Sequence, residues 1–103
     1  MNANFTKKDL KNGMVVELRD GHRYLILAGN AIKANGHKNL EHYKDDLTWG
    51  NYRNWDIIKI YNIITGRVSN FYTLFAKDNL ELIWERKESI HMTTENAPYV
   101  ELY

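Results

Sequence analysis

The stretch Met14-Val-Val-Glu-Leu-Arg-Asp-Gly-His-Arg-Tyr-Leu-Ile-Leu27 determines the fold that we predict for this chain. Two runs of β-forming residues flank Asp20-Gly21, and an Asp-Gly pair in this position is a strong signal for a β-hairpin with a two-residue turn. That turn places Arg19 opposite His22. One face of the hairpin then collects five aliphatic side chains: Met14, Val16, Leu18, Leu25 and Leu27. Because a slip of one residue would distribute them over both faces, the pattern predicts a fixed register.

Short elements are expected on either side of this hairpin. Upstream, residues 6–13 predict one helical turn, with Thr6 and Asp9 as an imperfect capping box and Gly13 at its end. Downstream, residues 31–34 predict a third short strand after a tight turn. Residues 35–54 are polar and irregular, and within them residues 41–47 fit a helical turn or an irregular strand equally well.

Regular alternation returns in the second half of the chain. Residues 55–63 are rich in β-branched and aromatic residues and predict a strand with Ile58 and Ile60 inward and with Lys59 and Tyr61 outward.

Three further elements complete the prediction. Residues 69–76 place apolar side chains at helical spacing behind Ser69 and predict a short helix. Residues 80–86 predict the closing strand, with Leu82 and Trp84 inward. Residues 99–103 alternate like an edge strand.

Length and composition indicate one small domain with a packed core. The chain has 103 residues, of which 44% are hydrophobic and 26% are charged. We place the domain at residues 1–87 and a C-terminal tail at residues 88–103. The longest apolar run, Tyr24 to Ala28, is far too short to cross a membrane. No secretory signal is readable at the N-terminus, so we expect a cytoplasmic protein without membrane contact.

Metal binding finds little support in the sequence. The chain has no cysteine, which excludes disulfides, thiolate metal sites and a cysteine nucleophile. The four histidines are His22, His37, His42 and His91. His37 and His42 are five residues apart, a spacing that turns them away from each other on a strand and misses the pairing of a helix. We expect surface histidines and no metal site.

Four acidic residues could together serve acid–base chemistry or bind Mg²⁺: Glu41, Asp45, Asp46 and Asp56. A working pair of carboxyls must converge in a cleft, whereas neighbours in the sequence diverge. Asp-Asp before Leu-Thr is more typical of turns, in which the side chain accepts a hydrogen bond from a nearby backbone N–H. The structural role is therefore favoured.

Sequence motifs of catalysis are absent. No segment matches a phosphate-binding loop or a dinucleotide fingerprint, and the two serines, Ser69 and Ser89, lie outside any nucleophile elbow. We expect a protein that is not an enzyme and that uses no cofactor, with no catalytic, cofactor-binding or metal-binding residue to assign.

Aromatic residues interleaved with basic ones are the remaining candidates for function. The aromatic residues are Tyr43, Trp49, Tyr52, Trp55 and Tyr61, and the basic ones are Lys44, Arg53 and Lys59. Such rings bind single-stranded nucleic acid by stacking, or line peptide grooves, but they also fill the core of a small β-domain. The net charge of only +1 lacks the strong positive field of a dedicated nucleic-acid binder. Core packing or partner docking is therefore favoured.

The order of these elements resembles small uncharacterised proteins encoded in phages and prophages of Gram-positive bacteria. The resemblance rests on four segments: Asp9 to Val16 with the following hairpin, Tyr43 to Thr48, Trp55 to Tyr61, and Leu82 to Arg86. It covers most of residues 6–87 and implies a small SH3-like β-barrel of unknown role. It transfers no catalytic residue.

Together these observations predict an all-β or mainly β fold, a five- to six-stranded SH3-like barrel with one or two short helical turns. The expected function is that of a non-catalytic interaction module that binds a protein partner or itself, the latter as a homodimer through the C-terminal edge. The alternative is a weak nucleic-acid-binding domain that uses the aromatic residues of 43–61. Steep salt dependence would distinguish phosphate binding from protein binding.

Overall fold

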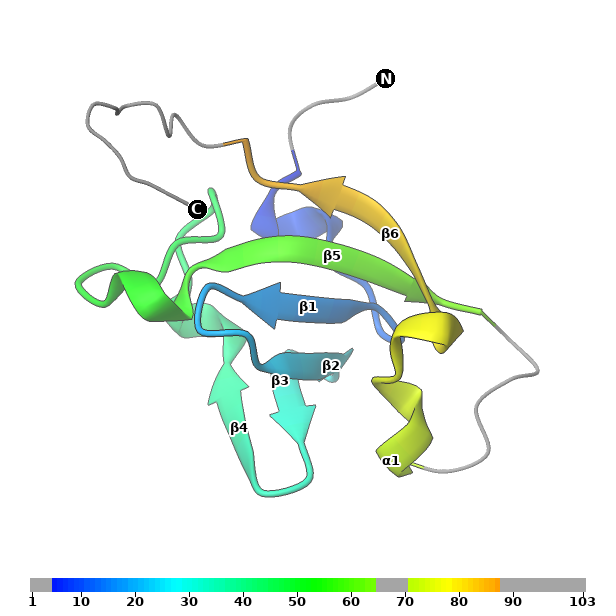
Figure 1. The fold of residues 1–103 in the computed structure, drawn as a ribbon. Helices are drawn as coiled ribbons and strands as arrows, with labels where there is room; N and C mark the ends of the chain where they lie inside the picture. The colour runs from blue at the N-terminus through cyan, green and yellow to red at the C-terminus, as the bar shows by residue number, and fades with distance from the viewer. Residues whose placement is uncertain (1–4, 65–70, 88–103) are drawn as a thin grey trace, which may run out of the picture.

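The computed structural model describes residues 5–64 and 71–87, and these form one six-stranded antiparallel sheet (Figure 1). The spatial order is β4-β3-β2-β1-β5-β6. The strands are β1 (Val15–Leu18), β2 (Arg23–Leu27), β3 (Asn30–Lys33), β4 (Gly36–Asn39), β5 (Ile57–Ile63) and β6 (Leu80–Glu85). One helical turn, η1 (Lys7–Asp9), precedes the first strand. The others lie between strands: η2 (Leu40–His42), η3 (Arg53–Trp55), α1 (Phe71–Leu74) and η4 (Lys77–Asn79). The prediction of a mainly β fold is confirmed.

The sheet is not closed into a barrel, which corrects the prediction. Closure would require β4 to pair with β6, and within the described residues these two strands are the ends of the order. Figure 1 shows β3 and β4 running across the direction of β1, β5 and β6, so that β4 and β6 lie on opposite sides of the molecule.

The central hairpin forms, but its predicted register is wrong by one residue. Val15 pairs with Leu25, Val16 with Tyr24, and Glu17 with Arg23. The backbone N–H of Leu18 donates to the oxygen of His22, so the turn contains three residues and not two. The third of them, Gly21, adopts a left-handed φ of 93°, as is typical of a type I turn followed by a bulge.

The changed register divides the five aliphatic side chains that were predicted to share one face. Val16 and Leu18 are fully buried on one face, and Met14 packs against their cluster. Leu25 packs on the opposite face with Val15. Leu27 is 45% exposed. Tyr24 and Ile26 occupy the places that the prediction gave to Leu25 and Leu27.

Other short elements agree with the prediction in part. Thr6 and Asp9 form the predicted capping contact, with the Thr6 N–H and hydroxyl both donating to the Asp9 carboxyl (2.9 and 3.0 Å). The third strand and the short helix α1 are present. The strand β4 lies in the stretch 35–54, where we predicted an irregular conformation. The turn η2 overlaps residues 41–47, for which a helical turn was one of the two open alternatives. The Ser69 cap and the predicted edge strand at residues 99–103 lie outside the described residues.

The predicted inward and outward residues of β5 require a correction. A register shift between Glu17 and Leu18 places Ile57 next to Leu18, so Ile57 and Ile60 face the main core while Ile58 is only half-buried. Tyr61 was predicted to face outward, but it is 8% exposed. It is buried because a second apolar cluster covers that face of the sheet.

The predicted orientation of β6 is wrong at one of its two positions. Trp84 pairs with Ile60 and packs against the main core, as expected. Leu82 pairs with Tyr61, on the other face of the sheet, and is 47% exposed. A register shift in this pair leaves Ile83 as the extra residue of a bulge, so simple alternation fails here.

The two faces of the sheet carry separate apolar clusters. The main core contains nine buried residues: Val16, Leu18, Tyr24, Ile26, Ala31, Tyr43, Leu47, Ile57 and Ile60. The smaller cluster, with Val15, Tyr61 and Leu80, lies under Leu74 and Phe75 at the end of α1. None of the helical turns in the described residues has the length and apolar character that crossing a membrane requires.

Candidate functional site

Four of the five predicted aromatic residues come together on one side of the sheet. Tyr43, Trp49, Tyr52 and Trp55 form a continuous row, which we call the aromatic cluster. Tyr61 does not belong to it, since it lies on the opposite face. All four members of the cluster therefore lie in residues 40–56, the segment that connects β4 and β5.

Edge-to-face packing holds the aromatic cluster together. The ring centroids of Tyr43 and Trp49 are 4.9 Å apart, those of Trp49 and Trp55 are 5.0 Å apart, and those of Tyr52 and Trp55 are 4.9 Å apart. The interplanar angles lie between 76° and 86°. Each ring thus places an edge against a neighbouring face, an arrangement typical of stable aromatic packing. Tyr43 is buried, and Tyr52 is 46% exposed.

A lysine from β4 covers the face of one tryptophan. The Nζ atom of Lys38 lies 3.6 Å from the ring centroid of Trp55, and it is 5.4 Å from Tyr24 and 5.9 Å from Trp49. This is a cation–π contact within the chain. Desolvation lowers the pKa of Lys38 from its ordinary value, and the nearby Lys33 lowers it further, whereas Asp20 acts in the opposite direction.

The basic residues predicted to flank the aromatic side chains are not gathered with them. Lys44 and Arg53 are exposed on the same connecting segment. Lys59 lies on the strand β5 and approaches Glu85 of β6, with 3.9 Å between Nζ and Oε2. A shared groove of aromatic and basic side chains does not form from the predicted set.

Hydrogen bonds fix the connecting segment from within. The Tyr43 hydroxyl donates to the backbone oxygen of Trp55 at 2.6 Å, and burial raises its pKa. Asp56 is 6% exposed and accepts from the Trp49 N–H at 2.9 Å and from Arg19 Nη2 at 3.1 Å. Asp56 thus fastens the segment to the hairpin turn.

The acidic residues that invited an acid–base interpretation have structural roles or point to solvent. Asp46 accepts from the N–H and the hydroxyl of Thr48, the turn arrangement that the sequence favoured. Asp56 is enclosed as described, and Glu41 and Asp45 are exposed.

The histidines do not assemble either. His22, His37 and His42 are all exposed, and within residues 5–64 and 71–87 no group of three side chains is arranged to hold a metal ion. His91 lies outside the described residues.

A polar network crosses the sheet on the face of the smaller cluster. The Glu17 carboxyl accepts from Arg23 Nε at 2.9 Å and from the Tyr61 hydroxyl at 2.8 Å. Arg23 Nη1 donates to the backbone oxygen of Phe75 at 2.8 Å. Burial alone would raise the pKa of Glu17, but the hydrogen bonds from Arg23 and Tyr61 outweigh it and lower the pKa.

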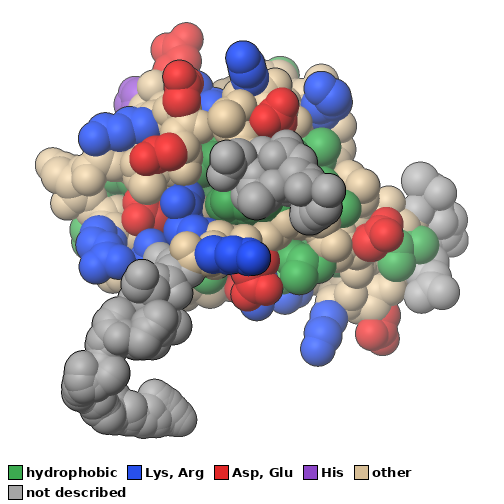
Figure 2. Space-filling model, turned by 90° about the horizontal axis from the view of Figure 1, so that it is seen from above, with side chains coloured by type: hydrophobic (Ala, Val, Ile, Leu, Met, Phe, Trp, Pro, Cys, Tyr) green, Lys and Arg blue, Asp and Glu red, His purple; other side chains and the backbone are tan. Residues whose placement is uncertain are grey.

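The outer edge of β6 exposes apolar side chains. Leu82 and Ile83 are 47% and 37% exposed, and Glu81 and Glu85 flank them along the strand. Figure 2 views the molecule from the β6 side and shows hydrophobic side chains among charges of both signs. The face in this view therefore carries no field of a single sign.

Sequence reasoning missed two features that the structure brings forward. Lys38 was not considered because Gly36–Asn39 is too short and polar to predict a strand. A pocket lined by His22, Arg23, Lys33 and Phe75 joins three segments that have no pattern in common. Only the pairing of β2 with β3 brings their turns together.

Comparisons with models of protein families, with curated proteins and with solved structures found no match to this chain.

Proposed function

We propose that this chain is a non-catalytic module that binds a protein partner along the outer edge of β6. The observation that carries the proposal is the exposure of Leu82 and Ile83 side by side on an edge strand. Edge strands with exposed apolar side chains invite pairing with another chain, and proteins usually protect such edges.

The outer side of β6 is open to an added strand, and the bulge at Ile83 is the one interruption of its pairing with β5 in the described residues. Within the described residues, β6 pairs only with β5, so its other side presents backbone N–H and C=O groups. An extended segment that adds to such an edge gains backbone hydrogen bonds, while side chains at alternate positions give specificity.

Charge along β6 indicates the chemistry of the partner. Glu81 is exposed, and the side chain of Glu85 is 55% exposed despite its contact with Lys59. Antiparallel pairing of β6 with the β6 of a second copy would gather four glutamates, and like charges on paired strands destabilise them. We therefore favour an extended segment of another protein, with basic residues alternating with apolar ones, over self-association.

Two features weigh against the nucleic-acid alternative. Base stacking needs open ring faces, but the aromatic cluster packs edge to face, and Lys38 covers the face of Trp55. The net charge is only +1. An origin in a phage or prophage, the SH3-like relationship, the domain boundary at residue 87, the cytoplasmic location and the absence of enzymatic activity all remain predictions.

The experiment compares three forms of the chain in binding two labelled peptides of alternating Lys-Val and Glu-Val. The forms are the wild type, the double variant Leu82→Glu/Ile83→Glu, and Leu27→Glu as a control of matched exposure (45%) outside β6. We expect the Lys-Val peptide to bind the wild type and the control, to bind the double variant at least tenfold more weakly, and to protect β6 amides from hydrogen exchange.

Three outcomes would overturn the proposal. The first is equal binding of the Lys-Val peptide to the wild type and the double variant, and the second is protection at strands other than β6. The third is saturable binding of labelled single-stranded DNA that weakens steeply with salt while neither peptide binds, which would favour the alternative. Sedimentation of the wild type at high concentration tests self-association. A dimer that forms in the wild type but not in the double variant would show that a second copy of this chain, and not another protein, binds the edge of β6.

A further inference from the structure

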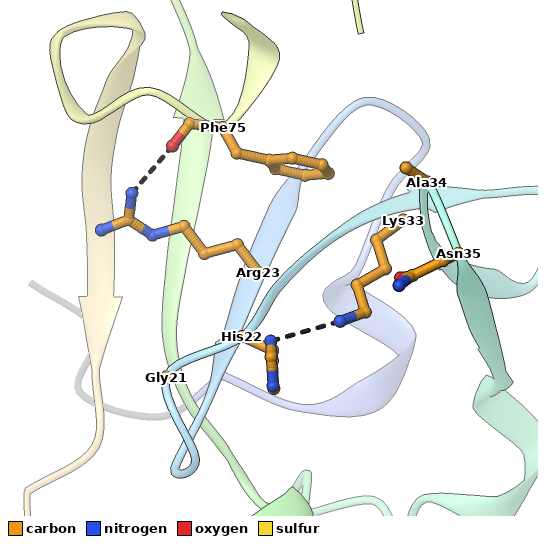
Figure 3. Close-up of a pocket in the computed structure, with 7 residues that line it drawn as sticks. All are labelled: Gly21, His22, Arg23, Lys33, Ala34, Asn35 and Phe75. Carbon is orange, nitrogen blue, oxygen red and sulfur yellow. Dashed lines mark hydrogen bonds between the residues drawn. The ribbon is translucent and has the colours of Figure 1, made fainter. Parts of the chain in front are cut away.

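A pocket of about 390 Å³ lies where two hairpin turns and the end of α1 meet. Gly21, His22 and Arg23 contribute from the turn between β1 and β2 and the start of β2, and residues 33–35 contribute from the end of β3 and the turn that follows it (Figure 3). Phe75 forms the remaining wall. No residue of β6 lines the pocket, so the inference drawn from it does not rest on the function proposed above.

The polar lining of the pocket is basic. Arg23 and Lys33 carry positive charges, and among the described lining residues none is acidic. Glu17 neutralises part of the charge on Arg23. Asp20 does not line the pocket, but it belongs to the same turn as Gly21, and its carboxyl accepts from the His22 N–H at 3.0 Å.

Lys33 reaches into this region without a carboxylate partner. Its Nζ atom lies 3.2 Å from Nδ1 of His22, and since an ammonium only donates, Nδ1 accepts (Figure 3). It also lies over the Tyr24 ring, as does Lys38. In the described part of the chain neither lysine forms an ion pair with an acid. Lys38 does not line the pocket, so the positive charge that a ligand would meet there comes from Lys33 together with Arg23.

The opposite wall is apolar and held in place. Arg23 Nη1 donates to the backbone oxygen of Phe75, and Figure 3 shows the Phe75 ring extending from that point towards Ala34. A ligand in the pocket would thus meet an aromatic ring on one side and cationic groups on the other. Binding sites commonly combine an apolar wall with a few polar groups that fix the orientation.

We propose that this pocket binds a small organic anion, a carboxylate or phosphate group carried on a planar or apolar body. The anionic group lies against Lys33 and His22, and the apolar body packs against Phe75. The Asn35 side chain, with both donor and acceptor atoms, lies at the rim for a further hydrogen bond.

The test is a titration of the full chain followed by amide chemical shifts in NMR spectra. The probes are phenyl phosphate, benzoate, inorganic phosphate and the neutral benzyl alcohol. We expect saturable shifts at the amides of residues 21–23, 33–35 and 75 with phenyl phosphate and benzoate. Inorganic phosphate should bind more weakly because it lacks the apolar body, and benzyl alcohol more weakly because it lacks the charge.

Two lysine variants make the test specific. Lys33→Gln should weaken the binding of phenyl phosphate about two- to fivefold, the effect of removing one exposed charge pair. Lys44→Gln, an exposed lysine outside the pocket, should bind as the wild type does. Shifts spread over the whole surface, equal binding by both variants, or no saturable shift with any anion would each overturn the proposal. Unchanged amide shifts elsewhere in Lys33→Gln verify that it is folded.

Discussion

At the scale of single residues, Gly21 determines the geometry of the central hairpin. Its φ of 93° lies in the region that favours glycine, and its N–H donates to the oxygen of Leu18 at 2.9 Å. The Asp20 side chain supports the turn by accepting from the His22 N–H. A β-carbon at Gly21 would meet nothing within 4 Å, so the backbone conformation alone demands glycine.

We expect Gly21→Ala to lower the free energy of unfolding by roughly 1–2 kcal/mol, because an L-residue in a left-handed conformation is strained. Urea denaturation measures the change. Gly36→Ala is the matched control: Gly36 is also in a hairpin turn region with open space around it, but its φ is not left-handed. Equal destabilisation by the two substitutions would contradict this account.

The same residue explains why the turn was predictable and its register was not. Asp20-Gly21 fits a two-residue turn with both residues left-handed, and it equally fits a three-residue turn in which only the glycine is left-handed. The choice depends on which side chains the rest of the fold buries. Tyr24 and Ile26 pack in the main core with Val16, and that preference is set by strands distant in sequence.

At the scale of elements, the network of Glu17, Arg23 and Tyr61 joins three strands and the end of α1. β1 contributes the acceptor, β2 and β5 contribute the donors, and Arg23 extends the network to the backbone of Phe75. A carboxylate that accepts two such hydrogen bonds is favoured in its charged form. The network therefore links the stability of this face to pH.

We expect the stability supplied by Glu17 to be lost in acid. Its pKa is lower in the folded chain than the ordinary value of 4.5, so folding favours the charged form. That contribution is complete above about pH 5 and disappears as the pH falls through the folded pKa. Glu17→Gln should therefore show a smaller loss of unfolding free energy between about pH 5 and pH 3 than the wild type.

Chemical denaturation at several pH values measures this difference. Glu41→Gln serves as the control, since Glu41 is exposed and its backbone N–H, not its carboxyl, makes the local contact with Asn39. If Glu17→Gln retained the full pH dependence of the wild type, the network would not be the cause.

Elements were predictable to the extent that they alternate regularly. β2, β3 and the core of β5 follow from β-branched and aromatic runs, whereas bulges are not visible in the sequence. One bulge places Ile57 in the core where Ile58 was predicted, and another leaves Leu82 exposed. All four members of the aromatic cluster were among the predicted candidates, and Tyr61 was included wrongly. Lys38, which covers Trp55, was not predicted because β4 carries no apolar alternation.

At the scale of the whole molecule, the two apolar clusters share the same strands. Val15 and Val16 are neighbours in β1, yet they belong to different clusters. Residues near both limits of the described part of the chain hold the segment before β5 and the start of that strand: Lys7 donates from its side chain to the oxygen of Tyr43, and Arg86 donates to the oxygens of Asp46 and Ile57. Neither cluster can lose its strands without disrupting the other.

We therefore expect unfolding to be a single cooperative transition. Trp49, Trp55 and Trp84 all pack against the main core, so tryptophan fluorescence follows that side, whereas far-ultraviolet circular dichroism follows the whole sheet. The two melting curves should coincide. Separate midpoints would show that the clusters unfold independently.

The pairing of β1 with β5 has a consequence for the time course of folding. The turns between β1 and β4 are short, but Glu17 and Tyr61 are separated by 44 positions. Closing so long a loop carries an entropic barrier before any contact compensates it, so we expect local hairpins to form early and the docking of β5 to limit the rate. Until that step, the hydrophobic side of the early meander stays open to solvent, and the chain is then most vulnerable to aggregation.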